Sequence, residues 1–275
     1  ASDVYKRQAD PVPARGGALE VRNLVFSYGD GPRVLDGMSA TFEPGTLTAL
    51  VGSSGSGKST VARLLARFHD PVEGSVLLGG DDLRDIAVRD VHRSVSVVFQ
   101  DPQLLTLPLR ENIRLARRDA TDGEIMAAAK LANLDTVIAA LPKGLDSVVN
   151  VDVTFSGGEA QRVAIARSIV TDAPVLIFDE ATAYADPASE ALIQSAIERL
   201  ARSRTVIVIA HRLSTIRNAD RILVLDGGAV AEAGTHDELL ARGGRYRELW
   251  RAFALDDEPS APRGTEADDE KAGNR

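Results

Sequence analysis

Short apolar runs alternate with helical patterns along most of this chain, and within the runs the hydrophobicity is continuous rather than alternating. Strands that are buried on both faces, as in parallel sheets, have this pattern. The sequence therefore predicts an α/β fold with a mainly parallel central sheet. The runs that we expect to form its strands are 46–51, 95–99, 175–178, 206–209 and 222–225.

Two regions depart from this pattern. Residues 19–26 alternate apolar and polar side chains for part of their length, which predicts an edge strand. Residues 102–172 favour helix and contain no evident strand, with helical patterns at 111–117, 122–132 and 134–141. We therefore expect a helical subdomain of about residues 102–172, inserted in the sheet.

Both ends of the chain have the composition of segments outside a fold. Residues 1–17 mix charge, proline and glycine without periodicity and resemble a linker or a non-native remnant. Residues 256–275 are rich in Asp, Glu, Pro and Gly and nearly lack large apolar side chains, so we expect a disordered acidic tail. One domain, residues 18–255, remains between them.

Composition narrows the class of function. The 275 residues include 40 acidic and 32 basic side chains, a formal net charge of -8. This charge gives no general attraction for nucleic-acid phosphates, so we expect no nucleic-acid partner. The chain has no cysteine, which excludes disulfides and thiolate metal sites. Its apolar runs, such as 205–210, are too short to cross a bilayer as helices.

Residues 52–59 fit the pattern G-x-x-x-x-G-K-[ST] in full. A predicted strand precedes them and a helical pattern at 59–68 follows, which is the context that a phosphate loop requires. Lys58 can then reach the β and γ phosphates, while the Ser59 hydroxyl can ligate Mg²⁺. The alternative, a Ser/Gly turn with a surface lysine, does not account for the flanking strand and helix. The predicted nucleotide contacts are Gly52, Ser53, Ser54, Gly55, Ser56, Gly57, Lys58, Ser59 and Thr60.

Two carboxylates, Asp179 and Glu180, directly follow the apolar run 175–178. Ligands of parallel α/β sheets gather at the carboxyl ends of the strands. Asp179 would hold Mg²⁺ directly or through water, and Glu180 would orient and polarise the attacking water. Alone, the pair also fits a solvated strand end or a helix cap. The phosphate loop in the same chain favours the metal site.

A second candidate anion site is Ser156-Gly157-Gly158-Glu159, which opens a helical pattern. Backbone donors at a helix start suit an anion. Because the chain's own loop already takes up a nucleotide, this site indicates the γ-phosphate of a nucleotide that a partner holds. The same residues also fit an ordinary N-cap with a capping-box glutamate. His211, after the apolar run 205–210, likewise also fits a satisfied core histidine.

In their order and spacing, these motifs resemble the ATP-binding-cassette (ABC) ATPase domain, and the resemblance covers residues 19–254. It implies a P-loop NTPase fold with an antiparallel β edge beside the parallel sheet, and ATP and Mg²⁺ as cofactors. It also implies a head-to-tail dimer in which each nucleotide lies between one subunit's phosphate loop and the other's signature. The residues that match the signature are Ser156, Gly157 and Gly158.

The resemblance further implies roles for single residues. Tyr28 would stack on adenine, and Gln100 would sense Mg²⁺ and couple to a transmembrane partner. Asp186 matches the D-loop aspartate, and His211 the switch histidine that contacts the γ-phosphate. Considered alone, Tyr28 is also typical of an edge-strand aromatic and Gln100 of a strand-end amide.

Parts of the sequence point to one branch of the family. Residues 98–101, 109–113 and 234–240 are similar to exporter-type cassettes, and residues 158–162 and 184–187 to cassettes of siderophore-linked transporters with the exporter fold.

Other positions depart from the exporter pattern. Exporter types usually carry a Gly-Glu-rich segment before the signature, whereas residues 149–154 are Val-Asn-Val-Asp-Val-Thr, so the acidic coupling residue is absent or displaced. Phe155 replaces the usual leucine, and Tyr184-Ala185-Asp186 replaces Ala-Leu-Asp. These changes leave the hydrolytic residues intact and fall at positions where the resemblance implies coupling and dimer closure.

We therefore expect an ATPase that powers an exporter-type transporter through dimer closure, at the cytoplasmic face of the cell membrane. Its catalytic residues would be Glu180, His211, Lys58 and Gln100. Its partners would be a second cassette, identical or not, and a transmembrane domain in the same or a separate chain. Residues 1–17 resemble a severed junction, which favours the same chain.

Two alternative functions remain open at this point. A soluble ABC ATPase of nucleic-acid maintenance is disfavoured, because the chain has one cassette and no sustained heptads. A nucleotide-binding module without hydrolysis is disfavoured by Glu180 and His211.

Overall fold

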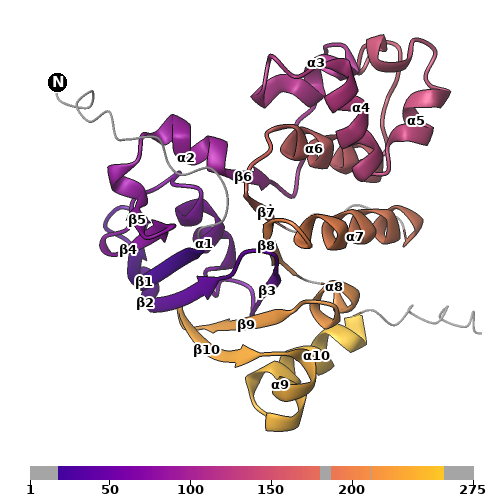
Figure 1. Ribbon diagram of the computed structural model, residues 1–275. Helices are drawn as coiled ribbons and strands as arrows, with labels where there is room; N and C mark the ends of the chain where they lie inside the picture. The colour runs from indigo at the N-terminus through magenta and orange to yellow at the C-terminus, as the bar shows by residue number, and fades with distance from the viewer. Residues whose placement is uncertain (1–17, 180–186, 211, 257–275) are drawn as a thin grey trace, which may run out of the picture.

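The computed structural model describes residues 18–179, 187–210 and 212–256. The predicted linker at 1–17 and nearly all of the predicted acidic tail lie outside the described residues. The described part contains two β-sheets, a group of helices beside the larger sheet, and further helices packed on the sheets (Figure 1). No helix in these ranges is long and apolar enough to span a membrane.

The larger sheet has six strands in the order β10-β9-β3-β8-β7-β6. Five of them are parallel, and β10 runs antiparallel to β9. The predicted mainly parallel sheet is thus confirmed. The strands are β3 (Leu47–Val51), β6 (Val95–Val98), β7 (Val175–Asp179), β8 (Thr205–Ile209), β9 (Arg221–Asp226) and β10 (Ala229–Gly234).

Strand β7 shows why the apolar runs are continuous. Leu176 and Phe178 belong to one core cluster, whereas Val175 and Ile177 belong to a second cluster on the opposite face of the sheet. Because both faces are covered, every position of the strand is buried. The residues at the carboxyl end of β7 thus follow a fully buried strand.

A second sheet, of four antiparallel strands, has the order β2-β1-β4-β5 and confirms the antiparallel edge of the fold. The prediction that residues 19–26 form an edge strand is wrong, because β1 pairs with both β2 and β4. Alternation reports that the two faces of a strand differ in burial and says nothing about its neighbours in the sheet. The strands are β1 (Leu19–Ser27), β2 (Arg33–Phe42), β4 (Glu73–Leu78) and β5 (Asp81–Asp82).

Helices occupy the segment predicted to be a helical subdomain, and Figure 1 shows them grouped beside β6. Within residues 102–172, all of which the structure describes, only isolated bridges such as Pro108 with Val148 have β character. The helices are α3 (Leu109–Ile113), α4 (Asp122–Leu131), α5 (Asp135–Ala140) and α6 (Gly157–Val170), with short 3₁₀ turns at Arg114–Ala116 and Gly144–Asp146.

The other helices pack on the two sheets. In Figure 1, α1 lies between the antiparallel sheet and the parallel sheet, and α7 lies below the helical group. These helices are α1 (Lys58–Leu65), α2 (Val88–Ser94), α7 (Pro187–Ala201), α8 (Leu213–Arg217), α9 (His236–Arg242) and α10 (Arg245–Asp256), and a 3₁₀ turn spans Leu83–Asp85.

Candidate functional site

The loop between β3 and α1 contains two glycines, Gly52 and Gly57, that have no space for a side chain. Strand β9 pairs in parallel with β3, with Val51 opposite Val224, so the backbone of β9 runs close beside Gly52. A Cβ atom on Gly52 would lie 2.4 Å from the carbonyl oxygen of Leu225 and 2.6 Å from the Ser56 hydroxyl. The backbone at Gly57, the residue that caps α1, has a φ of 100°. Glycine is therefore required at these positions by the fold itself, before any phosphate is considered.

We expect Gly52→Ala to lower the free energy of unfolding by about 1–3 kcal/mol, because the new methyl group meets the fixed Leu225 carbonyl. Chemical denaturation followed by circular dichroism measures this change. Gly123→Ala is the matched control, since only the Thr121 hydroxyl, at 3.9 Å, lies within 4 Å of its Cβ position. That replacement should raise the free energy by about 0.4–1 kcal/mol. Equal effects of the two substitutions would contradict the steric argument.

Lys58 directs its ammonium group back over the loop. Its Nζ donates hydrogen bonds to the carbonyl oxygens of Gly52, at 2.9 Å, and Ser53, at 3.0 Å. The residue is 6 % exposed. Because the ammonium group is already held against the loop, it would need little reorganisation to bind an anion there.

The Ser59 hydroxyl on α1 donates a hydrogen bond of 3.3 Å to Oδ1 of Asp179, at the carboxyl end of β7. These two residues are 120 positions apart in the sequence. Hydroxyl and carboxylate oxygens are the ligands that Mg²⁺ prefers. The donor set therefore fits the predicted magnesium site, with Ser59 and Asp179 on adjoining elements.

A buried hydroxyl beside Lys58 also suits a phosphate ligand. Ser56 is 6 % exposed, and its Oγ has no hydrogen-bond partner among the residues that the structure describes. An unpaired buried hydroxyl costs free energy unless a ligand satisfies it. The loop thus presents an unused donor where the sequence predicts phosphate oxygens.

Tyr28 follows β1 and lies close to the start of α1. Its hydroxyl shares a hydrogen bond of 3.2 Å with Thr60 Oγ1 and accepts one of 3.3 Å from Arg63 Nη1. Tyr28 is 42 % exposed. The structure thus brings two of the predicted nucleotide contacts, Tyr28 and Thr60, together. Arg63 was not predicted, although it lies three positions after Thr60 on a helix, where side chains are neighbours.

Gln100 lies two residues beyond the end of β6 and is exposed. Strand β6 pairs in parallel with β7, with Val98 opposite Phe178. Gln100 therefore lies just beyond the same edge of the sheet as Asp179. The preceding residue is tied to α6, since Gln161 Nε2 donates a 3.3 Å hydrogen bond to the Phe99 carbonyl oxygen. The sequence analysis did not single out Gln161, and nothing in its spacing marks this contact.

Ser156 is the N-cap of α6. Its Oγ accepts a hydrogen bond of 3.3 Å from the Glu159 backbone N–H, and Glu159 Oε2 accepts one of 2.8 Å from the Ser156 N–H. This reciprocal pair is a capping box. Among the described residues, no hydrogen bond joins residues 156–158 to the phosphate loop. In Figure 1, α6 lies with the helical group, apart from α1.

A model of the ABC transporter family matches residues 35–183, more than half of the chain. The chain belongs to the ABC transporter family. The family match confirms the ABC cassette resemblance predicted from the sequence.

Solved and curated proteins agree with this assignment. A bacterial Atm1-family ABC exporter with ATP bound superposes with a TM-score of 0.85 at 42% identity, over 94% of this chain and 45% of that one. The mycobactin import ATP-binding/permease protein IrtA of Mycolicibacterium thermoresistibile is 50% identical over 94% of this chain and 28% of its own length. An ATP-dependent lipid A-core flippase of Burkholderia pseudomallei is 45% identical over 88% of this chain and 41% of its own length.

The chain therefore spans less than half the length of each of these relatives. The exporter-type resemblance predicted from the sequence is confirmed by the Atm1-family structure.

Three of the predicted site residues, Glu180, Asp186 and His211, lie outside the described residues of the cassette, as does the segment 184–185. Their roles in hydrolysis and dimer contact stay predictions.

The segment before the signature forms a closed turn. Asp152, the one acidic residue of this segment, accepts a hydrogen bond of 2.9 Å from the Val148 N–H, and Lys143 Nζ lies 2.9 Å from its Oδ1. The Val148 N–H and then Lys143 lower the pKa of this carboxyl. Its side chain is 17 % exposed, whereas Val151 is 70 % exposed. At this turn the apolar side chain of Val151 is therefore exposed, whereas Asp152 is held by its contacts with Val148 and Lys143.

Proposed function

We propose that this cassette powers an exporter-type ABC membrane transporter, by closing on a second cassette when ATP binds and reopening after hydrolysis. The observation that carries the proposal is the Ser59–Asp179 hydrogen bond of 3.3 Å. It joins the phosphate loop to the carboxyl end of β7, the edge of the sheet at which ligands of parallel α/β sheets bind. The residues proposed to bind phosphate and metal therefore meet at this edge, and Glu180, proposed to orient the water, follows Asp179 in the sequence.

Each residue has a distinct part in the proposed reaction. Lys58 binds the β and γ phosphates and stabilises the charge that develops on them. Ser59, Asp179 and Gln100 would hold Mg²⁺, which when bound neutralises phosphate charge. Glu180 orients the attacking water and accepts its proton, and His211 contacts the γ-phosphate.

The signature completes the site of a second cassette. Residues 156–158 lie at the start of α6, a helix of 14 residues whose N-terminal end favours an anion. This chain's own phosphate loop makes no hydrogen bond to them within the described structure, which supports a contact with the nucleotide that the partner holds. Asp186 would contribute at the same interface. Closure is favoured as far as ATP binds the closed state better than the open one.

The proposed membrane partner is a transmembrane domain, in the same chain or a separate one, and the cassette works at the cytoplasmic face. The relatives support this, since their names describe permease, flippase and exporter proteins of greater length. Three relatives named for mycobactin import are 50–52% identical, against 45% for the flippase. This difference favours a transporter of the mycobactin type.

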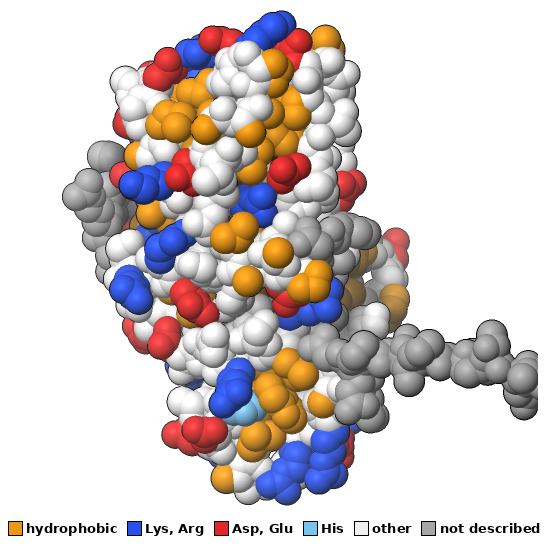
Figure 2. All heavy atoms as spheres, turned by 90° about the vertical axis from the view of Figure 1, so that its right-hand side faces the viewer, with side chains coloured by type: hydrophobic (Ala, Val, Ile, Leu, Met, Phe, Trp, Pro, Cys, Tyr) orange, Lys and Arg blue, Asp and Glu red, His pale blue; other side chains and the backbone are white. Residues whose placement is uncertain are grey.

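Nucleic-acid maintenance is the less favoured function. On the described atoms of the face in Figure 2, acidic and basic side chains are interspersed, without a continuous basic surface. A net charge of -8 adds no general attraction for nucleic acid. ATPase activity stimulated by DNA would favour this alternative over transport.

Dimer closure is tested with Glu180→Gln, a variant that should bind ATP and hydrolyse it very slowly. We expect light scattering after gel filtration to give a dimer with Mg²⁺ and ATP and a monomer with ADP. Adding Ser156→Arg should keep the ATP-bound chain monomeric, because the arginine side chain fills the signature.

Ser203→Arg is the control for charge and size. Ser203 is exposed and precedes β8, at the edge of the sheet opposite to Asp179, so this variant should still form the dimer. A monomer in every nucleotide state of Glu180→Gln would disprove the proposed closure.

A further inference from the structure

The turn at the end of α1 separates two clusters of aromatic rings. The sequence pattern predicts helix over 59–68, but α1 ends at Leu65, and Arg67 takes a φ of 54°. The Phe68 N–H bonds to the Arg63 carbonyl oxygen at 2.8 Å, which closes the turn. The next two side chains, Phe68 and His69, then pack in different places.

His69 packs against the tyrosine that the nucleotide site uses. Its ring centroid lies 5.5 Å from that of Tyr28 at an interplanar angle of 90°, and 5.5 Å from that of Phe26. Phe26 itself meets Tyr28 edge-on at 4.9 Å. These separations and angles are those of favourable aromatic contacts. Three rings, from β1, the residue after it and the turn after α1, thus form one cluster.

Tyr28 is fixed at both ends by these contacts. Thr60 and Arg63 hold its hydroxyl, and Phe26 and His69 hold its ring. The residue nevertheless remains 42 % exposed, so it is accessible to a ligand. A stacking surface that is immobilised before the ligand arrives loses less conformational entropy on binding.

We infer that His69 is a positioning residue for nucleobase binding, acting by holding the Tyr28 ring in the orientation that stacks on the base. The inference rests on the proposed role of Tyr28. His69 would touch no phosphate and no reacting atom, so its contribution belongs to the affinity for the base-bearing part of the nucleotide and not to the hydrolytic step.

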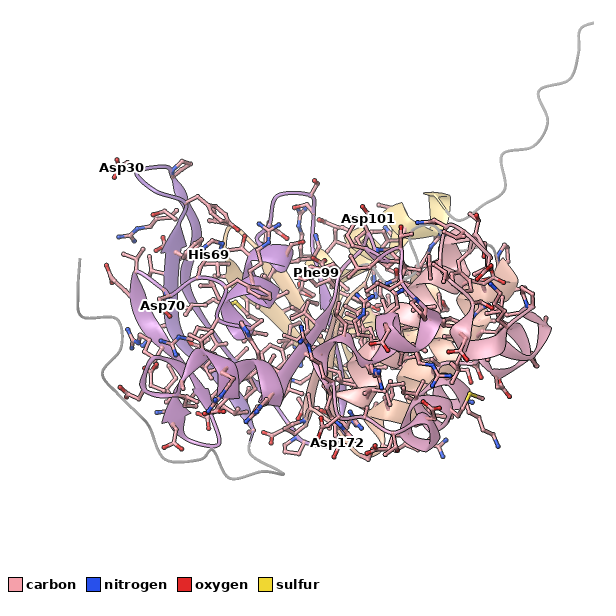
Figure 3. All side chains as sticks on the ribbon, turned by 90° about the horizontal axis from the view of Figure 1, so that it is seen from above. Asp30, His69, Asp70, Phe99, Asp101 and Asp172 are labelled. Carbon is pink, nitrogen blue, oxygen red and sulfur yellow. The ribbon has the colours of Figure 1, made fainter. Side chains whose placement is uncertain are left out.

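The second cluster supplies a matched control. Phe68 lies with its ring centroid 5.4 Å from that of His92 and 5.8 Å from that of Phe99. In the view of Figure 3, His69 lies between Asp30, in the loop after Tyr28, and Phe99. His92 resembles His69 because it is exposed and packs against a phenylalanine ring. Among the ring contacts of the described residues, however, His92 has none with Tyr28.

The test compares ADP with inorganic pyrophosphate, because both fill the phosphate loop and only ADP carries a base. We expect His69→Ala to raise the Kd for ADP about three- to tenfold, the range for loss of one aromatic contact. The Kd for pyrophosphate and the kcat for ATP should not change. His69→Phe should restore ADP binding, and His92→Ala should leave it unchanged. Isothermal titration calorimetry gives the constants, and thermal unfolding checks that each variant is folded.

A double-mutant cycle separates positioning from a general structural effect. In a Tyr28→Ala background, His69→Ala should have no further effect on ADP binding. Equal losses for ADP and pyrophosphate, or an undiminished effect without Tyr28, would overturn the inference. So would normal ADP binding in His69→Ala when Tyr28→Ala weakens it. If Tyr28→Ala itself left ADP binding intact, the proposed role of Tyr28 would fail, and the inference with it.

Discussion

Replacing Glu180 with glutamine is expected to lower kcat for ATP hydrolysis by about 10²- to 10⁴-fold, the range for loss of a general base. The glutamine keeps the size of the side chain but cannot accept the proton of the attacking water. ATP affinity should survive, because Lys58 and the phosphate loop are unchanged. Steady-state release of phosphate and equilibrium binding of ATP measure the two quantities separately.

Glu73→Gln is the matched control for this substitution. Glu73 is exposed at the start of β4, and its carboxylate lies 4.0 Å from Arg33, at the weak limit of an ion pair. The control should therefore hydrolyse ATP at the wild-type rate. Unchanged turnover in Glu180→Gln would remove Glu180 from the reaction.

Replacing Lys58 with methionine is expected to lower kcat by about 10²- to 10³-fold, as does loss of a donor aimed at charge that develops in a transition state. Affinity for ATP should fall as well, because the ammonium group contacts the phosphates before and during the reaction. The same variant should remain folded, since methionine retains the apolar stem of the side chain. Single-turnover kinetics and nucleotide titration measure these effects.

Lys130→Met is the matched control, because Lys130 is exposed on α4 in the helical group. It should change neither kcat nor ATP affinity. If Lys58→Met and Lys130→Met behaved alike, the loop at 52–59 would not be the nucleotide site.

The parallel strands could be predicted well from the sequence because β3, β7 and β8 are buried at every position and β9 at all but its ends. The continuous apolar runs around Val175 and Val206 are typical of strands in the centre of a sheet that is covered on both faces. Strand β10 was missed because its residues are only partly buried and show no such run. The edge position predicted for β1 was wrong because alternation gives the burial of faces, and neighbours are decided by pairing.

The candidate site divides in a similar way. The phosphate loop at 52–59 was predictable because its function requires a contiguous set of residues with fixed spacing. The Ser59–Asp179 contact joins positions 120 residues apart, and only the packing of α1 beside β7 places them together. Arg63 was not assigned because its contact with Tyr28 depends on how α1 packs beside the end of β1, and His69 because its contact depends on where α1 ends.

The sequence by itself determined the family and the sheet type and predicted the residues that would touch phosphate, because local spacing and burial on both faces are written along the chain. Only the tertiary structure decided that β1 is an inner strand and that Asp152 is turned into its own loop. It alone decided that His69 supports Tyr28. These are contacts between segments, and their energies depend on distances that a linear pattern does not contain.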